Sequence, residues 1–217
     1  MAKKFWWREF DVRHILPIGW DEEILNIASS SARSHTIIPK SVTSREMDSA
    51  LQLPVLTVGG EIIKALLPWL CDLYEGQFRR IGQQCVEEPV SIASQWRYAI
   101  NLNIQKGVMR YECHVDSNPL EGLLYATDHP QGSGGELVVA RQSGACGPEE
   151  IRRDANVIFP RAGHLVFFDA REHPHFVSNL IDPLAVRIAV AMNYYTPSCP
   201  ESARPPDLDR HLGIHAP

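Results

Sequence analysis

The spacing of apolar residues divides the chain into an early part with helical periodicity and a later part made of short strands. Between residues 60 and 84, apolar side chains recur every three or four positions and form one stripe, which predicts an amphipathic helix packed on a sheet. Pro68 has no backbone N–H, so we expect this helix to break or kink near Leu67. A shorter helix is predicted at residues 21–28, where acidic residues occupy the first turn.

After Pro89 the pattern changes to short β-like runs separated by Gly, Asn and Pro. An earlier aromatic run at residues 5–12 predicts one further strand at a sheet edge. The later predicted strands cover residues 94–104, 108–114, 123–127, 136–140, 164–168, 175–179 and 187–195. Several short strands at this spacing favour an antiparallel sandwich or barrel. We therefore predict an α+β fold with a double-stranded β-helix core (a jelly roll, cupin-like) and N-terminal supporting helices.

The length of 217 residues is compatible with one sizeable domain. Within it we expect an N-terminal helical and loop support region at 1–93, a jelly-roll core at 94–196 and a Pro-rich polar tail at 197–217 that forms an arm or a disordered end.

Charge and composition exclude several classes of partner. The net charge is −5 and no block of Lys and Arg is present, so we predict neither nucleic-acid binding nor attachment to an anionic membrane. No apolar run approaches the roughly 18 residues needed to span a bilayer, and the first ten residues lack a secretory signal. We expect a cytoplasmic protein. The five scattered cysteines contain no CxxC pair, so neither a disulfide framework nor a zinc cluster is indicated.

The candidate chemistry begins with His114 and Asp116. In an extended strand, side chains two positions apart point to the same face, so these two could bind one ion together. An imidazole nitrogen and a carboxylate oxygen make half of a site for a divalent transition metal. A later segment offers a third ligand in His173 or His175. Arg187 then stands in an apolar run, where a buried charge is expensive unless an anion binds it.

Five short motifs follow one another in a fixed order across residues 107–195: YECHVD, GGELVV, PRAGHLVFF, HFV and VRIAVAMNYY. This order resembles that of the Fe(II)- and 2-oxoglutarate-dependent oxygenases, in particular the prolyl-4-hydroxylase-like branch. That family has HxD, a GGxL strand, P-x-x-G-x-x-x-x-F, H-x-V and an arginine roughly ten residues further on. The part of the chain before about residue 94 carries no recognisable motif.

The resemblance implies roles for four residues. His114, Asp116 and His175 would bind Fe(II), and Arg187 would hold the C5 carboxylate of 2-oxoglutarate, which serves as cosubstrate together with O2. His175 is favoured over His173 because Val177 completes the family's H-x-V. Halogenating relatives have a small residue in place of the carboxylate. The presence of Asp116 therefore implies hydroxylation, or desaturation or ring formation by the same oxidant.

The resemblance is less complete around the substrate. Tyr111 matches a tyrosine of the prolyl-hydroxylase branch, but a second tyrosine expected some six or seven positions earlier is absent. Ala189 and Ala191 stand where a hydroxyl helper for the C5 carboxylate is expected. Further candidate pocket residues are Asn103, Tyr125 and Asn193.

The sequence thus predicts a dioxygenase that hydroxylates an unactivated C–H bond of a small molecule, such as an amino acid or a specialised metabolite. Three different functions also fit the pattern: a hydroxylase of a residue in a protein, a cupin-like metalloprotein that works without 2-oxoglutarate, and a jelly roll that only binds ligands.

Overall fold

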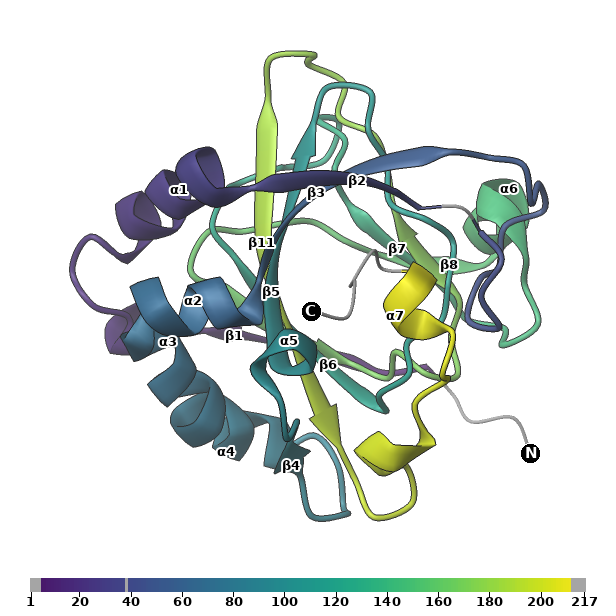
Figure 1. Cartoon of the computed structure of the whole chain (residues 1–217). Helices are drawn as coiled ribbons and strands as arrows, with labels where there is room; N and C mark the ends of the chain where they lie inside the picture. Colours follow the sequence, from purple (N-terminus) through teal and green to yellow (C-terminus); the bar gives the residue numbers. More distant parts are fainter. Residues whose placement is uncertain (1–4, 38, 212–217) are drawn as a thin grey trace.

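The protein, described here by a computed structural model for residues 5–37 and 39–211, contains two antiparallel sheets (Figure 1). The larger sheet has eight strands in the order β1-β9-β6-β11-β5-β3-β2, with β4 paired to β11. The smaller has the order β10-β7-β8. Apolar side chains of both sheets form a shared core that includes Leu123, Leu137, Val139, Ile158 and Val166. The predicted α+β double-stranded β-helix is confirmed.

The strands are β1 (Trp7–Asp11), β2 (Arg33–Ile37), β3 (Leu53–Gly59), β4 (Ser91–Ile92), β5 (Ile100–Lys106), β6 (Leu120–Tyr125), β7 (Leu137–Ala140), β8 (Ala155–Ile158), β9 (His164–Phe168), β10 (His175–Val177) and β11 (Val186–Tyr195). The α-helices are α1 (Trp20–Ser31), α2 (Gly60–Leu66), α3 (Pro68–Leu73), α4 (Arg79–Gln83), α5 (Trp96–Ala99), α6 (Gly147–Arg153) and α7 (Leu208–His211). Short turns of other helix types are η1 (Arg13–Ile15), η2 (Tyr74–Phe78) and η3 (Glu201–Ala203).

Helices α1 to α4 lie together on the outer face of the larger sheet (Figure 1). Their buried residues, among them Ile24, Ile63 and Leu70, belong to the same apolar cluster as the sheet residues Leu102 and Val190. The predicted long helix breaks as expected: α2 ends at Leu66, and α3 begins with a proline, which is well tolerated in the first turn of a helix. These helices cover the outer face of the larger sheet, and the cavity described below lies on its inner face.

Successive side chains along each strand of the larger sheet point to opposite faces of the sheet. On β5 and β11, apolar residues such as Leu102 and Val190 point to the helices. The alternate positions carry Asn101 and Asn103 on β5 and Arg187 on β11, and these side chains line a cavity on the other face. The outer surface of the sheet is therefore apolar, and its inner surface combines the shared apolar core with a polar part along β5 and β11.

Most predicted strands are found near their predicted places, and the predicted edge strand at residues 5–12 is β1, the last strand of its sheet. Two predictions need correction. Residues 94–104 are not one strand, because Trp96–Ala99 form α5 before β5 begins. The sequence pattern also gave no prediction of the strands β2, β3, β4 and β8 or of the helix α6.

The second correction concerns residues 108–114, which do not form a regular strand. Tyr111 and His114 donate to Val177 and His175 of β10, but Met109 donates to Lys106 and Cys113 to the side chain of Glu46. The bonds to β10 are therefore too few to form a continuous ladder. The premise that a strand aligns His114 and Asp116 is therefore wrong, although the two side chains do meet, as described below.

The predicted tail is described as far as residue 211, and its last six residues lie outside the described part. It packs against the segment around α5: the backbone N–H of Ser94 bonds to Glu201 at 2.8 Å, and the hydroxyl of Tyr98 donates to Asp209 at 2.7 Å. Among the described residues, none of the helices combines the length and the apolar character that crossing a bilayer would take.

Candidate metal and cosubstrate site

A short backbone bridge between two distant segments sets the position of His114 and His175. The N–H of His114 donates to the carbonyl of His175 at 3.0 Å, and the reverse bond measures 2.8 Å. This antiparallel pairing places the two imidazole rings 4.4 Å apart between centroids. The two histidines, 61 residues apart in sequence, are neighbours because of this one bridge.

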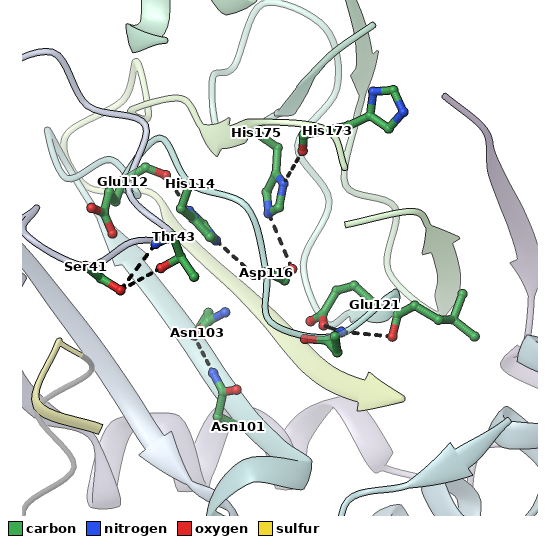
Figure 2. Close-up of polar contacts among 12 residues, drawn as sticks. Ser41, Thr43, Asn101, Asn103, Glu112, His114, Asp116, Glu121, His173 and His175 are labelled. Carbon is green, nitrogen blue, oxygen red and sulfur yellow. Dashed lines mark hydrogen bonds and ion pairs between the residues drawn. The ribbon is translucent and has the colours of Figure 1, made fainter. Parts of the chain in front are cut away.

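Asp116 completes the group. Its backbone N–H donates to the carbonyl of Ala170 at 2.9 Å, which turns its carboxylate toward the histidines. The Oδ1 atom lies 3.2 Å from Nε2 of His114, and Oδ2 lies 3.5 Å from Nε2 of His175. One possible ligand atom from each of the three residues lies within 4.8 Å of the others. Figure 2 shows the three side chains converging on one point.

Both histidines are oriented in the same way. Nδ1 of His114 lies 2.7 Å from the carbonyl of Glu112, and Nδ1 of His175 lies 3.0 Å from the carbonyl of His173. A carbonyl only accepts, so each Nδ1 donates its proton to it, and Nε2 is the ring nitrogen that faces Asp116 and could bind a metal. Such a second contact fixes the tautomer and direction of metal-binding histidines.

The pKa shifts of His114, Asp116 and His175 indicate that these three side chains together stabilise one positive charge, which a proton on His114 supplies. Burial lowers the pKa of His114, but the hydrogen bond and the charge of Asp116 outweigh it and raise the value to about 9. Burial and the neighbouring His114 lower the pKa of His175 to about 4. Burial opposes the ionisation of Asp116, yet the charge of the histidines holds its pKa below the usual range. One carboxylate and one positive charge are stable here, and a divalent cation would displace the proton.

His173, the competing candidate, lies elsewhere. It is buried, its Nδ1 lies 3.0 Å from the carbonyl of Ala140, and its ring packs edge-on against Phe5 at 5.1 Å. Figure 2 shows its ring pointing away from the other two histidines. His173 contributes its backbone carbonyl to the orientation of His175, and its side chain belongs to the core.

Arg187 on β11 is 1% exposed, yet in the part of the chain that the structure describes it forms no ion pair with a carboxylate. Its Nε atom has no hydrogen-bond partner. Gly135 makes room for the side chain, because a Cβ at that position would lie 3.1 Å from Cδ of Arg187. A guanidinium that is buried and unpaired costs free energy unless an anion binds it.

The ligand candidates and Arg187 line one cavity of about 750 Å³. The predicted pocket residues Asn103, Tyr111 and Asn193 also line it. Tyr125 does not, but its ring lies 5.4 Å from the guanidinium of Arg187, beneath the cavity wall. The Tyr111 hydroxyl faces the carbonyls of Leu56 and Ile104 at 3.4 and 3.5 Å, and burial raises its pKa.

Several cavity residues were missed by the sequence interpretation. Asn101 continues the alternation that brings Asn103 inward, and it donates to Asn103 at 2.6 Å. Glu121 lies opposite Asn193 in the register of β6 and β11. Burial and the charge of Asp116 raise the pKa of Glu121 well above the usual range. The period of two, applied to each confirmed strand, could have identified both.

Comparison with protein families gives one match: residues 97–195 match the family described as the 2OG-Fe(II) oxygenase superfamily. A sequence search of curated proteins finds no match.

Solved structures share the fold over most of the chain at low sequence identity. AviO1 from Streptomyces viridochromogenes Tue57 is 13% identical with a TM-score of 0.63, over 94% of each chain. A prolyl hydroxylase from Trichoplax adhaerens, solved with a hypoxia inducible factor peptide fragment, is 14% identical with a TM-score of 0.59, over 88% of this chain and 84% of its own. HygX from Streptomyces hygroscopicus, solved with nickel and 2-oxoglutarate, is 10% identical with a TM-score of 0.58, over 89% and 84%.

The family match begins at Arg97 and ends at Tyr195, and this stretch contains all five motifs of the sequence analysis together with the His114, Asp116 and His175 group. This stretch, a little under half of the chain, therefore resembles the 2OG-Fe(II) oxygenase superfamily in sequence and in fold, and the match indicates an oxygenase that uses Fe(II) with 2-oxoglutarate and O2 as cosubstrates.

Proposed function

We propose that this oxygenase hydroxylates an unactivated C–H bond of a small molecule, such as an amino acid or a specialised metabolite. The observation that carries the proposal is one cavity that holds both a group of two histidines and a carboxylate and a buried, unpaired arginine. Two imidazoles and one carboxylate on one side of Fe(II) leave three positions open, which is the arrangement of non-haem Fe(II) oxygenases.

In this proposal Nε2 of His114, Nε2 of His175 and a carboxylate oxygen of Asp116 hold the Fe(II). The donor set fits, because both Nε2 atoms are free of the Nδ1 proton and face the same carboxylate. Fe(II), when bound with 2-oxoglutarate and O2, supplies the oxidation of the substrate C–H bond. The protein holds the iron from one side and leaves the rest of its surface facing the cavity.

We assign to Arg187 the binding of the C5 carboxylate of 2-oxoglutarate. A planar guanidinium can give a carboxylate two parallel hydrogen bonds and keeps its charge at any pH of interest. Tyr111 and Tyr125 lie close enough for its charge to lower the pKa of each phenol, against the larger effect of burial. Tyr111 shares the cavity with Arg187, so its ring forms part of the wall near the guanidinium.

The size of the cavity favours a small substrate over a residue in a protein. A volume of about 750 Å³ lies within the range of small-molecule pockets and leaves space beyond the cosubstrate. A peptide substrate remains the second candidate function, because the solved relatives of this fold include a prolyl hydroxylase with a bound peptide fragment. The family match speaks against a metalloprotein that works without 2-oxoglutarate and against a jelly roll that only binds ligands.

An anaerobic titration tests the proposal. Metal-free protein receives Fe(II) and then 2-oxoglutarate, and the visible charge-transfer band of the chelate is recorded. We expect the band in wild type. In Arg187→Met we expect iron to bind as before, while the 2-oxoglutarate concentration at half-saturation rises about 100-fold, because a buried charge-assisted pair is lost. A chelate that forms equally well in both proteins would remove Arg187 from the proposal.

Succinate release then separates the two substrate classes. Wild type is supplied with Fe(II), 2-oxoglutarate, O2 and a panel of amino acids, other metabolites and peptides. Stimulation by free small molecules supports the proposed class. Stimulation by peptides alone would establish the second candidate function.

A further inference from the structure

The cavity has a second cluster of positive charge, away from Arg187. Arg187 pairs in register with Gln105 near the C-terminal end of β5, whereas α5, which carries Arg97, leads into the N-terminal end of the same strand. At about 3.3 Å per residue, the four residues from Gln105 to Asn101 separate these two ends by roughly 13 Å. The cosubstrate end and the Arg97 end are thus different places within one cavity.

Among the residues that the structure describes, the positive charge at the Arg97 end is not fully paired with carboxylates. The guanidinium groups of Arg97 and Arg204 lie 4.5 and 3.1 Å from the centre of the Tyr98 ring. Arg204 has a carboxylate partner, Asp209, at 3.2 Å, and the hydroxyl of Tyr98 donates to the same carboxylate. Arg97 forms no ion pair with any residue in the described ranges, and its buried Nε has no hydrogen-bond partner. Of the two guanidinium groups near Tyr98, that of Arg97 is therefore the one not paired with a carboxylate of the described residues.

The neighbouring acidic residues do not compensate for Arg97. Glu61 is exposed and lines the cavity, but no ion pair joins it to an arginine within residues 5–37 and 39–211. Asp116 faces the two histidines, and Glu121 accepts a hydrogen bond from Asn118 at 3.0 Å. Arg33, an exposed residue of the edge strand β2, adds one more positive charge to the wall of the cavity.

Between the Arg187 end and the Arg97 end, the wall of the cavity is polar. Asn101 and Asn103 line it from β5 and Asn193 from β11, and Asn193 is fixed by a 2.7 Å bond to the carbonyl of Tyr98. The residues next to them in register, Ala189 and Ala191, are small and leave space above the sheet. Figure 2 shows Asn101 and Asn103 along β5 below the group of histidines.

We propose that the Arg97 end of the cavity binds an anionic group of the substrate, a carboxylate or a phosphate, while the three asparagines hydrogen-bond to its polar body. Arg97 is the principal contact, because of the two guanidinium groups near Tyr98 it is the one that has no carboxylate partner within residues 5–37 and 39–211. This inference deepens the proposed function, since it takes the same cavity to hold the substrate. It narrows the substrate class to small anionic molecules.

Binding of simple probes tests the inference without knowledge of the substrate. Benzoate and phenyl phosphate serve as anionic probes, and benzamide and phenol serve as their neutral counterparts. Dissociation constants are measured by ligand-observed NMR under anaerobic conditions, with Fe(II) and just enough 2-oxoglutarate to saturate the chelate. The variants are Arg97→Met and, as a matched loss of charge far from the cavity, Arg80→Met on α4, where the side chain is exposed.

We expect at least one anionic probe to bind wild type about tenfold more tightly than its neutral counterpart. Arg97→Met should remove that difference, Arg80→Met should keep it, and Arg97→Lys should keep part of it. An unchanged chelate band in Arg97→Met shows that the fold is intact. Preference for benzoate over phenyl phosphate, or the reverse, identifies the anion.

Two results would overturn the inference: equal binding of charged and neutral probes to wild type, or an anion preference that survives in Arg97→Met. A missing chelate band in wild type is a separate failure, of the proposed function. In that case the probes are measured in metal-free Arg187→Met, where the cosubstrate arginine cannot bind them, against the double variant with Arg97→Met. Equal binding to these two proteins would contradict the inference on its own terms.

Discussion

The two candidate histidine ligands have nearly the same local geometry but are held by different means. His175 begins β10, which pairs with β7 along its length, with His175 opposite Val139. His114 lies in a segment without a ladder, which is held by bonds to His175 and Val177 of β10 and by contacts with residues 43–46. One ligand is held by a sheet and the other by a loop that packs against it.

Glu46 is the main contact on the loop side. Its carboxylate forms two bonds with Arg110, at 2.6 and 3.1 Å, and accepts the backbone N–H of Cys113 at 2.7 Å. These bonds hold the chain directly before His114. On the sheet side, backbone bonds do the same work for His175 and no single side chain carries it. We therefore expect the position of His114 to depend on the side chain of Glu46, and the position of His175 not to depend on any one side chain.

The largest effect on Fe(II) affinity is expected when a proposed ligand is removed, because it then does not matter whether a sheet or a loop holds the residue. His114→Ala, Asp116→Ala and His175→Ala each remove one of three proposed ligands, and we expect each to lower Fe(II) affinity by at least about 100-fold, whichever scaffold holds the residue. Equilibrium titration with Fe(II) under anaerobic conditions measures this. His173→Gln is the matched control, because the side chain of His173 lies away from the group. Loss of iron in this control with the fold intact would contradict the assignment of His175.

The contrast between the two segments also explains what the sequence could predict. Residues 175–177 form a strand where one was predicted, because their apolar neighbours and the preceding Pro174 give a clear local pattern. The order of the motifs led to the choice of His114, Asp116 and His175, whose side chains the structure brings within 4.8 Å of one another. The helical stripe with its break before Pro68 was equally local and equally predictable.

The rest depended on contacts between distant segments. Residues 108–114 have the alternation of a strand, but their hydrogen bonds go to separate partners that no local pattern can identify. Arg97 was included in a predicted strand and instead lies on α5, where Tyr98 bonds to Asp209, 111 residues later. The polar cavity wall was predicted only in part, because Tyr125 was counted within it and Asn101 and Glu121 were not.

The next largest effect is expected for Glu46→Gln. The variant keeps the shape of the side chain but removes the charge that pairs with Arg110, so the segment before His114 should loosen. We expect Fe(II) affinity to fall about tenfold, the size typical of a residue that supports a metal ligand, and the free energy of unfolding of the metal-free protein to fall by about 2 kcal/mol. Metal titration and urea unfolding measure the two quantities. An affinity equal to that of wild type would mean that the bridge to His175 alone positions His114.

The pH dependence of stability gives a second measure of the same contact. Burial raises the pKa of Glu46, but the hydrogen bonds from Arg110 and Cys113 outweigh it and leave the value below the usual range. A carboxyl with a lowered pKa stabilises the fold above the ordinary glutamate pKa of about 4.3, and this stabilisation is lost as the pH falls through the lower folded value. The difference in unfolding free energy between wild type and Glu46→Gln should therefore shrink below pH 4. A difference that stays constant from pH 7 to pH 3 would exclude the ionised carboxylate as its source.

The smallest effect is expected on the sheet side, for Arg152→Met. Arg152 is the counterpart of Glu46 near His175: it donates to Ser178 at 2.6 Å, lies 3.5 Å from Glu136 and stacks over Phe176 at 4.9 Å. Its side chain is 47% exposed, so we expect a loss of only about 0.5 kcal/mol in unfolding free energy. Fe(II) affinity should change less than about twofold, because the ladder between β10 and β7 remains to hold His175. If Arg152→Met weakened iron binding as much as Glu46→Gln does, both histidines would depend on side-chain contacts and the distinction between sheet and loop would be wrong.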